Sequence, residues 1–289
     1  MQNINPMLEN MNLIFSKLME SIDGTLINVI DNIIFLKPNN TIDKGLLKIL
    51  GTESSKGIIS IAITIALGIL IFYTLRYLIS KLTLEKVEEP IPFVLKMIII
   101  IAIIMSTTAI ITEIMNWNSY ITEEILNFQN NGIFFHNKKI TFKKFLININ
   151  SQLKGSGNKF DLFTFDGVIK LYVSMAMLNL IFEYAIRYIM VKLFIVLAPL
   201  AMVTKISKKT EYIFTNWAKS FFVLLFMQNV TAIILLIANN INLTGKDAII
   251  KLINVGMIYV LVKVSFFMKE LIGGIAIESN LPFRNFARY

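Results

Sequence analysis

The chain has 289 residues, of which 55% are hydrophobic and 16% are charged, and its mean hydropathy is +0.67. Ordinary soluble domains carry roughly 25% charged residues, so the composition argues against a soluble enzyme and favours an integral membrane protein. The chain has no cysteine, which excludes disulfides, thiolate nucleophiles and iron–sulfur ligation. The net charge of +9 fits lysines that face anionic lipid head groups, although nucleic acid would also attract it.

Residues 1–36 carry apolar side chains at helical spacing, with polar residues on the other side. This pattern predicts an amphipathic helix, which Gly24 can interrupt and which ends at Lys37-Pro38-Asn39-Asn40. We expect the N-terminal segment, residues 1–56, to lie outside, along the membrane interface or against partner subunits.

Apolar runs of about 20 residues are long enough to cross a bilayer as helices. Two spans are expected within residues 57–115, followed by an external central loop, residues 116–167. Three further spans are expected within residues 168–268, and residues 269–289 form a cytoplasmic tail. The sequence therefore predicts an all-α, polytopic membrane protein with five spans. They are Gly57–Ile79, Phe93–Met115, one that begins at Val168, Ala218–Ala238 and Ala248–Met268.

The apolar stretch from Val168 to Val203 is too long for one ordinary span. After Lys192 it holds a short apolar run that Pro199 interrupts, and proline breaks the interior of a helix. We therefore predict a re-entrant, interfacial or broken segment near residues 193–203. The alternative is a short sixth span.

Basic residues in short loops mark the cytoplasmic side of a membrane. With five spans, the basic clusters at residues 76–86, 205–209 and 269–288 all fall on one side. This arrangement places the N-terminus outside and the C-terminus inside. The central loop also carries lysines, but long loops are translocated with less regard to charge.

Polar residues within the spans are candidates for function. Glu183 and Arg187 lie four residues apart, so they share one helix face and can pair. They would form a polar lining or an ion-coupling pair, or, as we favour, mark the cytoplasmic edge of the third span together with Lys192. More central amides bond between helices or line a pore. These are Asn179, Gln228 and Asn229.

Four lysines of the central loop are interleaved with phenylalanines. Lysines bind phosphates and aromatic rings stack on unpaired bases, so this segment has the residue types that contact a single-stranded nucleic acid. We favour the alternative, a short amphipathic helix or hairpin that packs on a partner subunit. His136, the only histidine, lacks partners for a metal or catalytic site, and we expect no cofactor. The four lysines of this segment are Lys138, Lys139, Lys143 and Lys144, and its phenylalanines are Phe134, Phe135, Phe142 and Phe145.

The stretch Arg187–Leu236 resembles the TrbL-type conjugal transfer proteins, the polytopic inner-membrane subunits of type IV secretion systems. The resemblance rests on an apolar run into Ala198-Pro199-Leu200-Ala201, a short basic loop, an entry that contains Phe214 and Trp217, and a span that contains Gln228. The layout is also similar, with an outside N-terminus, two spans, a long external loop and three further spans.

The resemblance implies a channel-forming or scaffolding subunit of a machine that moves DNA or protein across the bacterial envelope. It implies other secretion subunits, separate ATPases and cargo in transit as partners, and a homo- or hetero-oligomer in the membrane. The chain has no phosphate-binding G-x-x-x-x-G-K-[ST] motif of its own. A secondary transporter or ion channel for a small solute is one alternative, although we find no internal repeat. A structural membrane-assembly protein is the other.

The topology is tested by reporter fusions. We expect fusions at the N-terminus and near Asn150 to report an outside location, and C-terminal fusions a cytoplasmic one, because the basic clusters hold their loops inside. Paired alkaline-phosphatase and fluorescent-protein fusions measure this. A cytoplasmic signal near Asn150 would overturn the five-span arrangement.

Overall fold

A computed structural model describes residues 10, 13–14, 17, 30–52, 56–83, 89–127, 141–145, 165–240 and 248–272. No strand occurs among these residues, which confirms the all-α prediction for this part of the chain. The helices are α2 (Ile30–Ile34), α3 (Pro38–Thr41), α4 (Lys44–Leu50), α5 (Ile58–Thr83), α6 (Pro90–Met105), α7 (Thr107–Asn127), α9 (Phe165–Val203), α10 (Glu211–Asn240) and α11 (Ala248–Ile272), with a short 3-10 helix, η2 (Thr204–Ile206).

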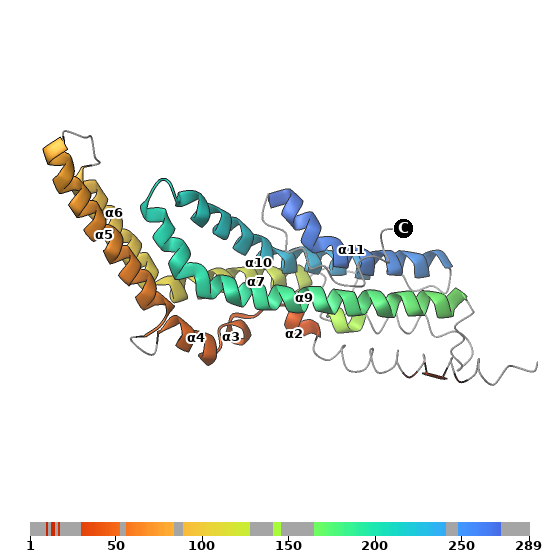
Figure 1. Ribbon diagram of the computed structural model, residues 1–289. Helices are drawn as coiled ribbons and strands as arrows, with labels where there is room; N and C mark the ends of the chain where they lie inside the picture. The colour runs from red at the N-terminus through yellow and green to blue at the C-terminus, as the bar shows by residue number, and fades with distance from the viewer. Residues whose placement is uncertain are drawn as a thin grey trace, which may run out of the picture.

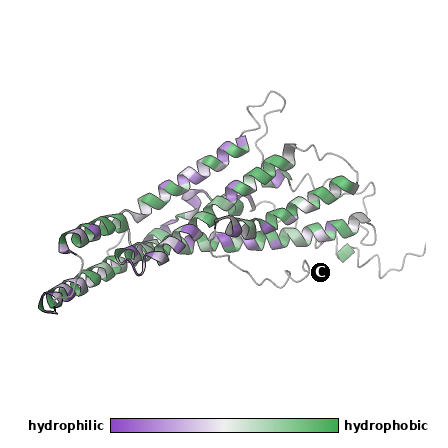
Figure 2. Cartoon of the chain, turned by 90° about the horizontal axis from the view of Figure 1, so that it is seen from above, coloured by the Kyte–Doolittle hydropathy of each residue, from purple (hydrophilic) through white to green (hydrophobic). Residues whose placement is uncertain are grey.

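Three helices, α5, α9 and α10, are long and apolar enough to cross a membrane, and α6 and α7, which are bent relative to each other at a break, meet the same criteria only as a pair. The hydrophobic colour dominates the helices in Figure 2. The fifth predicted span falls in α11, whose apolar stretch among the described residues is Val255–Val264. The chain is therefore a helical, membrane-embedded protein with several long apolar helices.

Helix α9 corrects the prediction of a broken segment near residues 193–203. The helix continues through Pro199 to Val203, and η2 follows directly. In Figure 1 the last turns of α9 change direction relative to the rest of the helix. A proline ring displaces the carbonyl four residues earlier, so it bends a helix that its neighbours hold together. At about 1.5 Å per residue, a helix of 39 residues extends well beyond the hydrocarbon layer.

The second predicted span, Phe93–Met115, falls on two helices. Helices α6 and α7 meet at Ser106 with a bend of 63°. Next to the break, the Thr107 hydroxyl donates to the carbonyl of Ile103, a local bond that competes with regular helix geometry. Helix α7 then continues to Asn127, so residues 116–127 are helical rather than part of the loop. The buried residues of α7 recur every three or four positions, as expected of an amphipathic helix: Thr107, Ile111, Met115, Asn118, Thr122 and Leu126.

Helices α7, α9, α10 and α11 form the central bundle, in which α10 contacts the other three. The hairpin of α5 and α6 packs on the end of α9 and leans away from the bundle (Figure 1). Ala62 and Ala66 lie one turn apart on α5, both fully buried, in a cluster that includes Met97 of α6 and Val203 of α9. Small side chains at this position allow the helices to approach closely.

Residues 30–50 form what we call the N-terminal strap, which lies along α9 and α7 (Figure 1). Ile34 and Leu36 of the strap are buried in the core of the chain itself. The strap contains α2, α3 and α4, which have five, four and seven residues. Most of the predicted amphipathic helix, residues 1–36, lies outside the described residues.

Two glycines allow the chain to turn from the strap into α5. Gly51 ends α4 with φ of 88°, a left-handed conformation that favours glycine. A Cβ atom on Gly57 would lie 2.4 Å from the Cα atom of Gly51, so backbone meets backbone at this point. The strap and α5 therefore join through a contact that has no room for a side chain.

We expect Gly57→Ala to lower the free energy of unfolding by about 2 kcal/mol, because the added methyl group must displace backbone. Gly68→Ala is the matched control, since a Cβ atom there meets nothing within 4 Å. Thermal unfolding of both variants in detergent measures the difference. Equal midpoints for Gly57→Ala and Gly68→Ala would contradict the close approach.

Candidate functional site

Helices α7, α9 and α10 place polar side chains in their shared interface. We call this group the polar belt. Burying polar groups is costly unless they are hydrogen-bonded, so each member needs a partner within the bundle. The members, all buried, are Asn118 and Thr122 of α7, Tyr184 and Arg187 of α9, and Gln228, Asn229 and Thr231 of α10.

Arg187 lies at the centre of the belt and is only 2% exposed. Its Nε atom donates to the carbonyl of Leu224 on α10 at 2.7 Å. One terminal nitrogen donates to the carbonyl of Ile34 at 2.8 Å, and the other contacts Oε1 of Gln228 at 3.4 Å. The guanidinium therefore joins α9, α10 and the strap. Only its planar arrangement of donors can reach acceptors in three directions.

Gln228 completes this junction on the other side of the strap. Its Oε1 atom accepts a hydrogen bond from the backbone N–H of Leu36 at 2.9 Å. Ile34 offers its carbonyl to Arg187, while Leu36 offers its N–H to Gln228. The strap is extended after α2, so these groups have no helical partners of their own. The two side chains supply the bonds that a helix would otherwise provide.

The rest of the belt holds α7 against α10. Asn229 donates to Oδ1 of Asn118 at 2.7 Å, and Asn118 donates to the carbonyl of Leu225 at 3.0 Å. Thr122 bonds to Asn229 as well. On the α9 side, the hydroxyl of Tyr184 bonds to Thr231. The amides act as bonds between helices, one of the two roles predicted for them.

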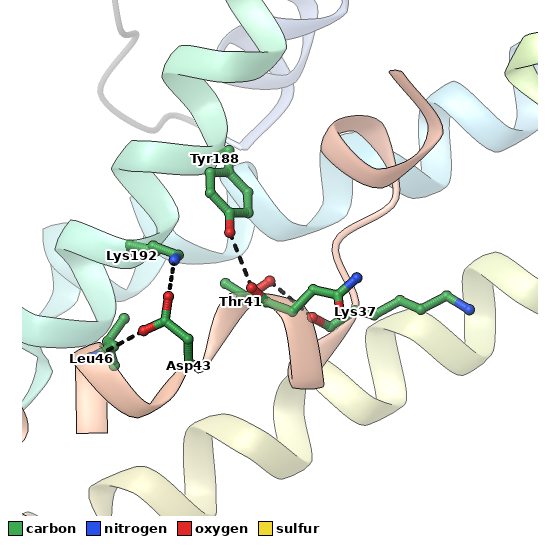
Figure 3. Close-up of polar contacts among 7 residues, drawn as sticks. Lys37, Thr41, Asp43, Leu46, Tyr188 and Lys192 are labelled. Atoms are coloured by element: carbon green, nitrogen blue, oxygen red, sulfur yellow. Dashed lines mark hydrogen bonds and ion pairs between the residues drawn. The ribbon is translucent and has the colours of Figure 1, made fainter. Parts of the chain in front are cut away.

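The outer edge of the strap is held by two residues of α9 (Figure 3). The Tyr188 hydroxyl donates to the carbonyl of Asn40 at 3.0 Å. The Lys192 ammonium pairs with Asp43 at 2.6 Å, and Asp43 also caps α4 by accepting from the N–H of Leu46 at 2.8 Å. The hydrogen bond from Lys192 and the N–H of Leu46 hold the pKa of Asp43 below its usual value. Arg187, Tyr188 and Lys192 thus follow the strap along one face of α9.

The structure changes the interpretation of Glu183 and Arg187. The hydrogen bonds of the Arg187 guanidinium go to Leu224, Ile34 and Gln228, and its Cζ atom lies 5.7 Å from the centroid of the Tyr184 ring. Arg187 is a buried junction between helices rather than a mark of the membrane edge. Lys192, one turn further on, is the partly exposed residue. Glu183 and Asn179 are both partly buried on α9.

Trp217 and Pro199 belong to one joint between α9 and α10. The indole N–H of Trp217 donates to the carbonyl of Phe194 at 3.1 Å, and its ring stacks on Phe221 with centroids 5.5 Å apart. Phe194 directly precedes Ile195. The carbonyl of Ile195 lies four residues before Pro199 and is the one that the proline ring displaces. The bend of α9 and the entry of α10 are therefore held together by one side chain.

The central loop is described only at residues 141–145, where Phe142–Phe145 form one helical turn. Phe142 is fully buried in the core of this chain, and its N–H donates to Asp31 of the strap at 2.9 Å. Burial of this carboxylate raises the pKa of Asp31. Lys143 and Lys144 are exposed. The phenylalanine therefore packs on its own chain, while Lys138, Lys139 and His136 lie outside the described residues.

Sequence reasoning missed the contact between the strap and α9. One signal was available, since an arginine in the middle of a long apolar helix requires buried partners. A second was Asp43, which precedes Lys44-Gly45-Leu46 as a helix N-cap. Neither signal names the partner, because Ile34 and Arg187 are 153 residues apart in the chain.

Comparisons of the chain with protein-family models, with curated proteins and with solved structures found no match. Among the described residues, no group of three or more histidine, cysteine, aspartate or glutamate side chains could hold a metal ion. The class of the protein therefore rests on its own helices, which are those of a membrane-embedded helical protein.

We expect Arg187→Met to lower the free energy of unfolding by about 3 kcal/mol, because the carbonyls of Ile34 and Leu224 lose their donor. Arg187→Lys should recover little, since the single nitrogen of lysine cannot replace three separate nitrogens that each contact a different acceptor. Lys263→Met, at an exposed position of α11, is the control. Thermal unfolding in detergent compares the three. An unchanged midpoint for Arg187→Met would show that the junction does not stabilise the fold.

Proposed function

We propose that this chain is a scaffolding or channel subunit of a type IV secretion machine, which moves DNA or protein across the bacterial envelope. The observation that carries the proposal is the joint between Trp217 and the carbonyl of Phe194, beside Pro199. These residues lie within the segment that resembles the TrbL-type proteins. The motif therefore corresponds to one packed unit rather than to scattered similarities.

The polar belt favours a scaffolding role for the single chain. Gln228 and Asn229 bond to neighbouring elements and are both 1% exposed, so they do not line an open passage in this conformation. A passage wide enough for a polypeptide or a DNA strand needs several copies, or other subunits, around it. The outer surfaces of α5 and α6 are apolar and exposed within the single chain, so lipid or other subunits can cover them.

The location and partners follow from the same proposal. The protein lies in the bacterial inner membrane with its N-terminus outside and its C-terminus in the cytoplasm. The exposed Lys205, Lys208 and Lys209 between α9 and α10 then face the cytoplasm, as basic turns do. Energy comes from separate ATPases, and DNA or protein is cargo in transit. The chain itself has a structural role and catalyses no reaction.

The proposal is tested by deleting the gene in its native host and measuring transfer of DNA and secretion of protein. Loss of either process, restored by the wild-type gene, supports the proposal. Normal transfer and secretion in the deletion strain would contradict the proposal. The remaining alternatives would then be a small-solute transporter and a structural membrane-assembly protein. Solute uptake by vesicles that contain the purified chain separates those two.

Trp217→Ala should lower transfer while the protein still inserts, because the bond to Phe194 and the stacking on Phe221 are lost together. We expect a loss of about 2–3 kcal/mol in stability. Trp217→Phe keeps the ring but removes the N–H, so its effect should be intermediate. Transfer frequency and the amount of protein in the membrane are measured side by side. If Trp217→Ala transfers at the wild-type frequency, the contact between Trp217 and Phe194 is not required for transfer.

Pro199→Ala should also lower transfer, because the restored backbone N–H lets the end of α9 straighten. Pro90→Ala is the control, since Pro90 stands in the first turn of α6, where proline costs little. The same assay compares them at equal protein levels. If the two variants transfer equally, the bend of α9 is not required.

A further inference from the structure

A cavity of about 180 Å³ lies between the strap and α7 and reaches inward to Gln228. Phe35 and Leu36 of the strap form one wall, and Ser119 and Thr122 of α7 form another. We call this cavity the vestibule. It brings open space to the edge of the polar belt, deep between three elements of the fold.

The vestibule has the chemistry of a hydrated space. Of its charged residues, Lys37 pairs with Glu123 at 3.5 Å, and Asp31 accepts a hydrogen bond from the N–H of Phe142 at 2.9 Å. Two neutral groups have no hydrogen bond to any described residue, the Nε2 amide of Gln228 and the hydroxyl of Ser119. Water needs roughly 10–15 Å³ and two to four polar partners, so the vestibule has room for several molecules. The vestibule therefore has room for water at the amide of Gln228, a side chain that is otherwise buried.

The strap closes the inner end of the vestibule. The backbone of Leu36 lies at the vestibule wall and donates to Gln228, while Arg187 and Asn229 do not line the space. Arg187 holds the adjacent carbonyl of Ile34. Moving residues 34–36 away would expose the belt to vestibule water. It would also free the acceptor of Gln228 and one donor of Arg187.

The strap is held in part by apolar side chains that are buried in the core, Ile34, Leu36, Leu46 and Leu50. It also has polar contacts. They are the bonds of Arg187 and Gln228 to its backbone, the bond of Tyr188 to Asn40, and the two ion pairs of Lys37 and Lys192. Helices as short as α2, α3 and α4 are not stable without such contacts. Helices α7, α9 and α10, in contrast, pack on one another directly.

We propose that the strap is a removable closure, and that its withdrawal joins the vestibule to the polar belt as a hydrated path between α7, α9 and α10. The proposal has two consequences. The first is that withdrawal of the strap lets water reach the polar belt, which is independent of the proposed function. The second, that withdrawal accompanies transport, rests on that function. Two experiments address them separately.

Water access is measured by cysteine labelling, for which a chain without cysteine is a clean background. Ser119→Cys in the vestibule should react with a charged, membrane-impermeant methanethiosulfonate reagent in every background. Asn229→Cys, behind the strap, should react slowly. Removing the outer tether with Asp43→Asn and Lys192→Met should speed the reaction of Asn229→Cys about fivefold, because labelling follows the open population. An unchanged rate there, or an unreactive Ser119→Cys, would overturn the proposal.

The role in transport is measured by locking the strap. Asp43→Cys with Lys192→Cys, joined by a reducible bifunctional thiol reagent, should block transfer, and reduction should restore it. Lys96→Cys with Ser207→Cys is the matched control, because it joins α6 to the turn after η2 and leaves the strap free. Each single cysteine, treated with the same reagent, controls for modification alone.

Normal transfer with the strap locked, or equal loss with the control pair locked, would overturn the role of the strap in transport. The labelling result would still decide whether the closure exists. If the deletion strain transfers normally, the proposed function fails, and Asn229→Cys labelling continues to test the closure by itself.

Discussion

The fold depends on one buried cation whose partners are backbone carbonyls rather than a carboxylate. Arg187 sits in the longest helix and bonds to Leu224 of α10 and to Ile34 of the strap. A buried charge without partners would cost several kcal/mol, so these elements must meet at this point. Every arrangement of α9, α10 and the strap that lacks the two carbonyls is disfavoured. The polar belt thereby specifies the register of an interface that is otherwise apolar and could slide.

Apolar contacts within a bilayer distinguish poorly between alternative helix pairings, because lipid tails are as apolar as the side chains. Buried amides and hydroxyls supply the missing specificity. Asn118 and Asn229 align α7 with α10, while Tyr184 and Thr231 align α9 with α10. The same groups that fix the packing also create the polar interior beside the vestibule. Stability and a latent hydrated path therefore come from one set of residues.

The middle and the C-terminal end of α9 have different roles in this arrangement. Its middle holds the strap through Arg187, Tyr188 and Lys192. Its C-terminal end contains Pro199 and accepts a hydrogen bond from Trp217 at Phe194. The same end packs on the α5–α6 hairpin through Val203. A movement of the strap and a movement of the hairpin would thus act on the same helix. This physical connection is what a subunit needs if it transmits change across a membrane.

The sequence by itself determined the class of the protein and the position of its apolar helices, because length and hydropathy are local properties that the bilayer constrains directly. It also singled out Arg187, Gln228, Asn229, Pro199 and Trp217. Only the tertiary structure decided their partners, since the acceptors of Arg187 and Trp217 are backbone carbonyls that no side-chain pattern marks. It likewise decided that α9 passes through Pro199 unbroken while the helix before α7 breaks at Ser106. Neighbouring helices outweigh local propensity at Pro199, and their contacts join residues that are far apart in the chain.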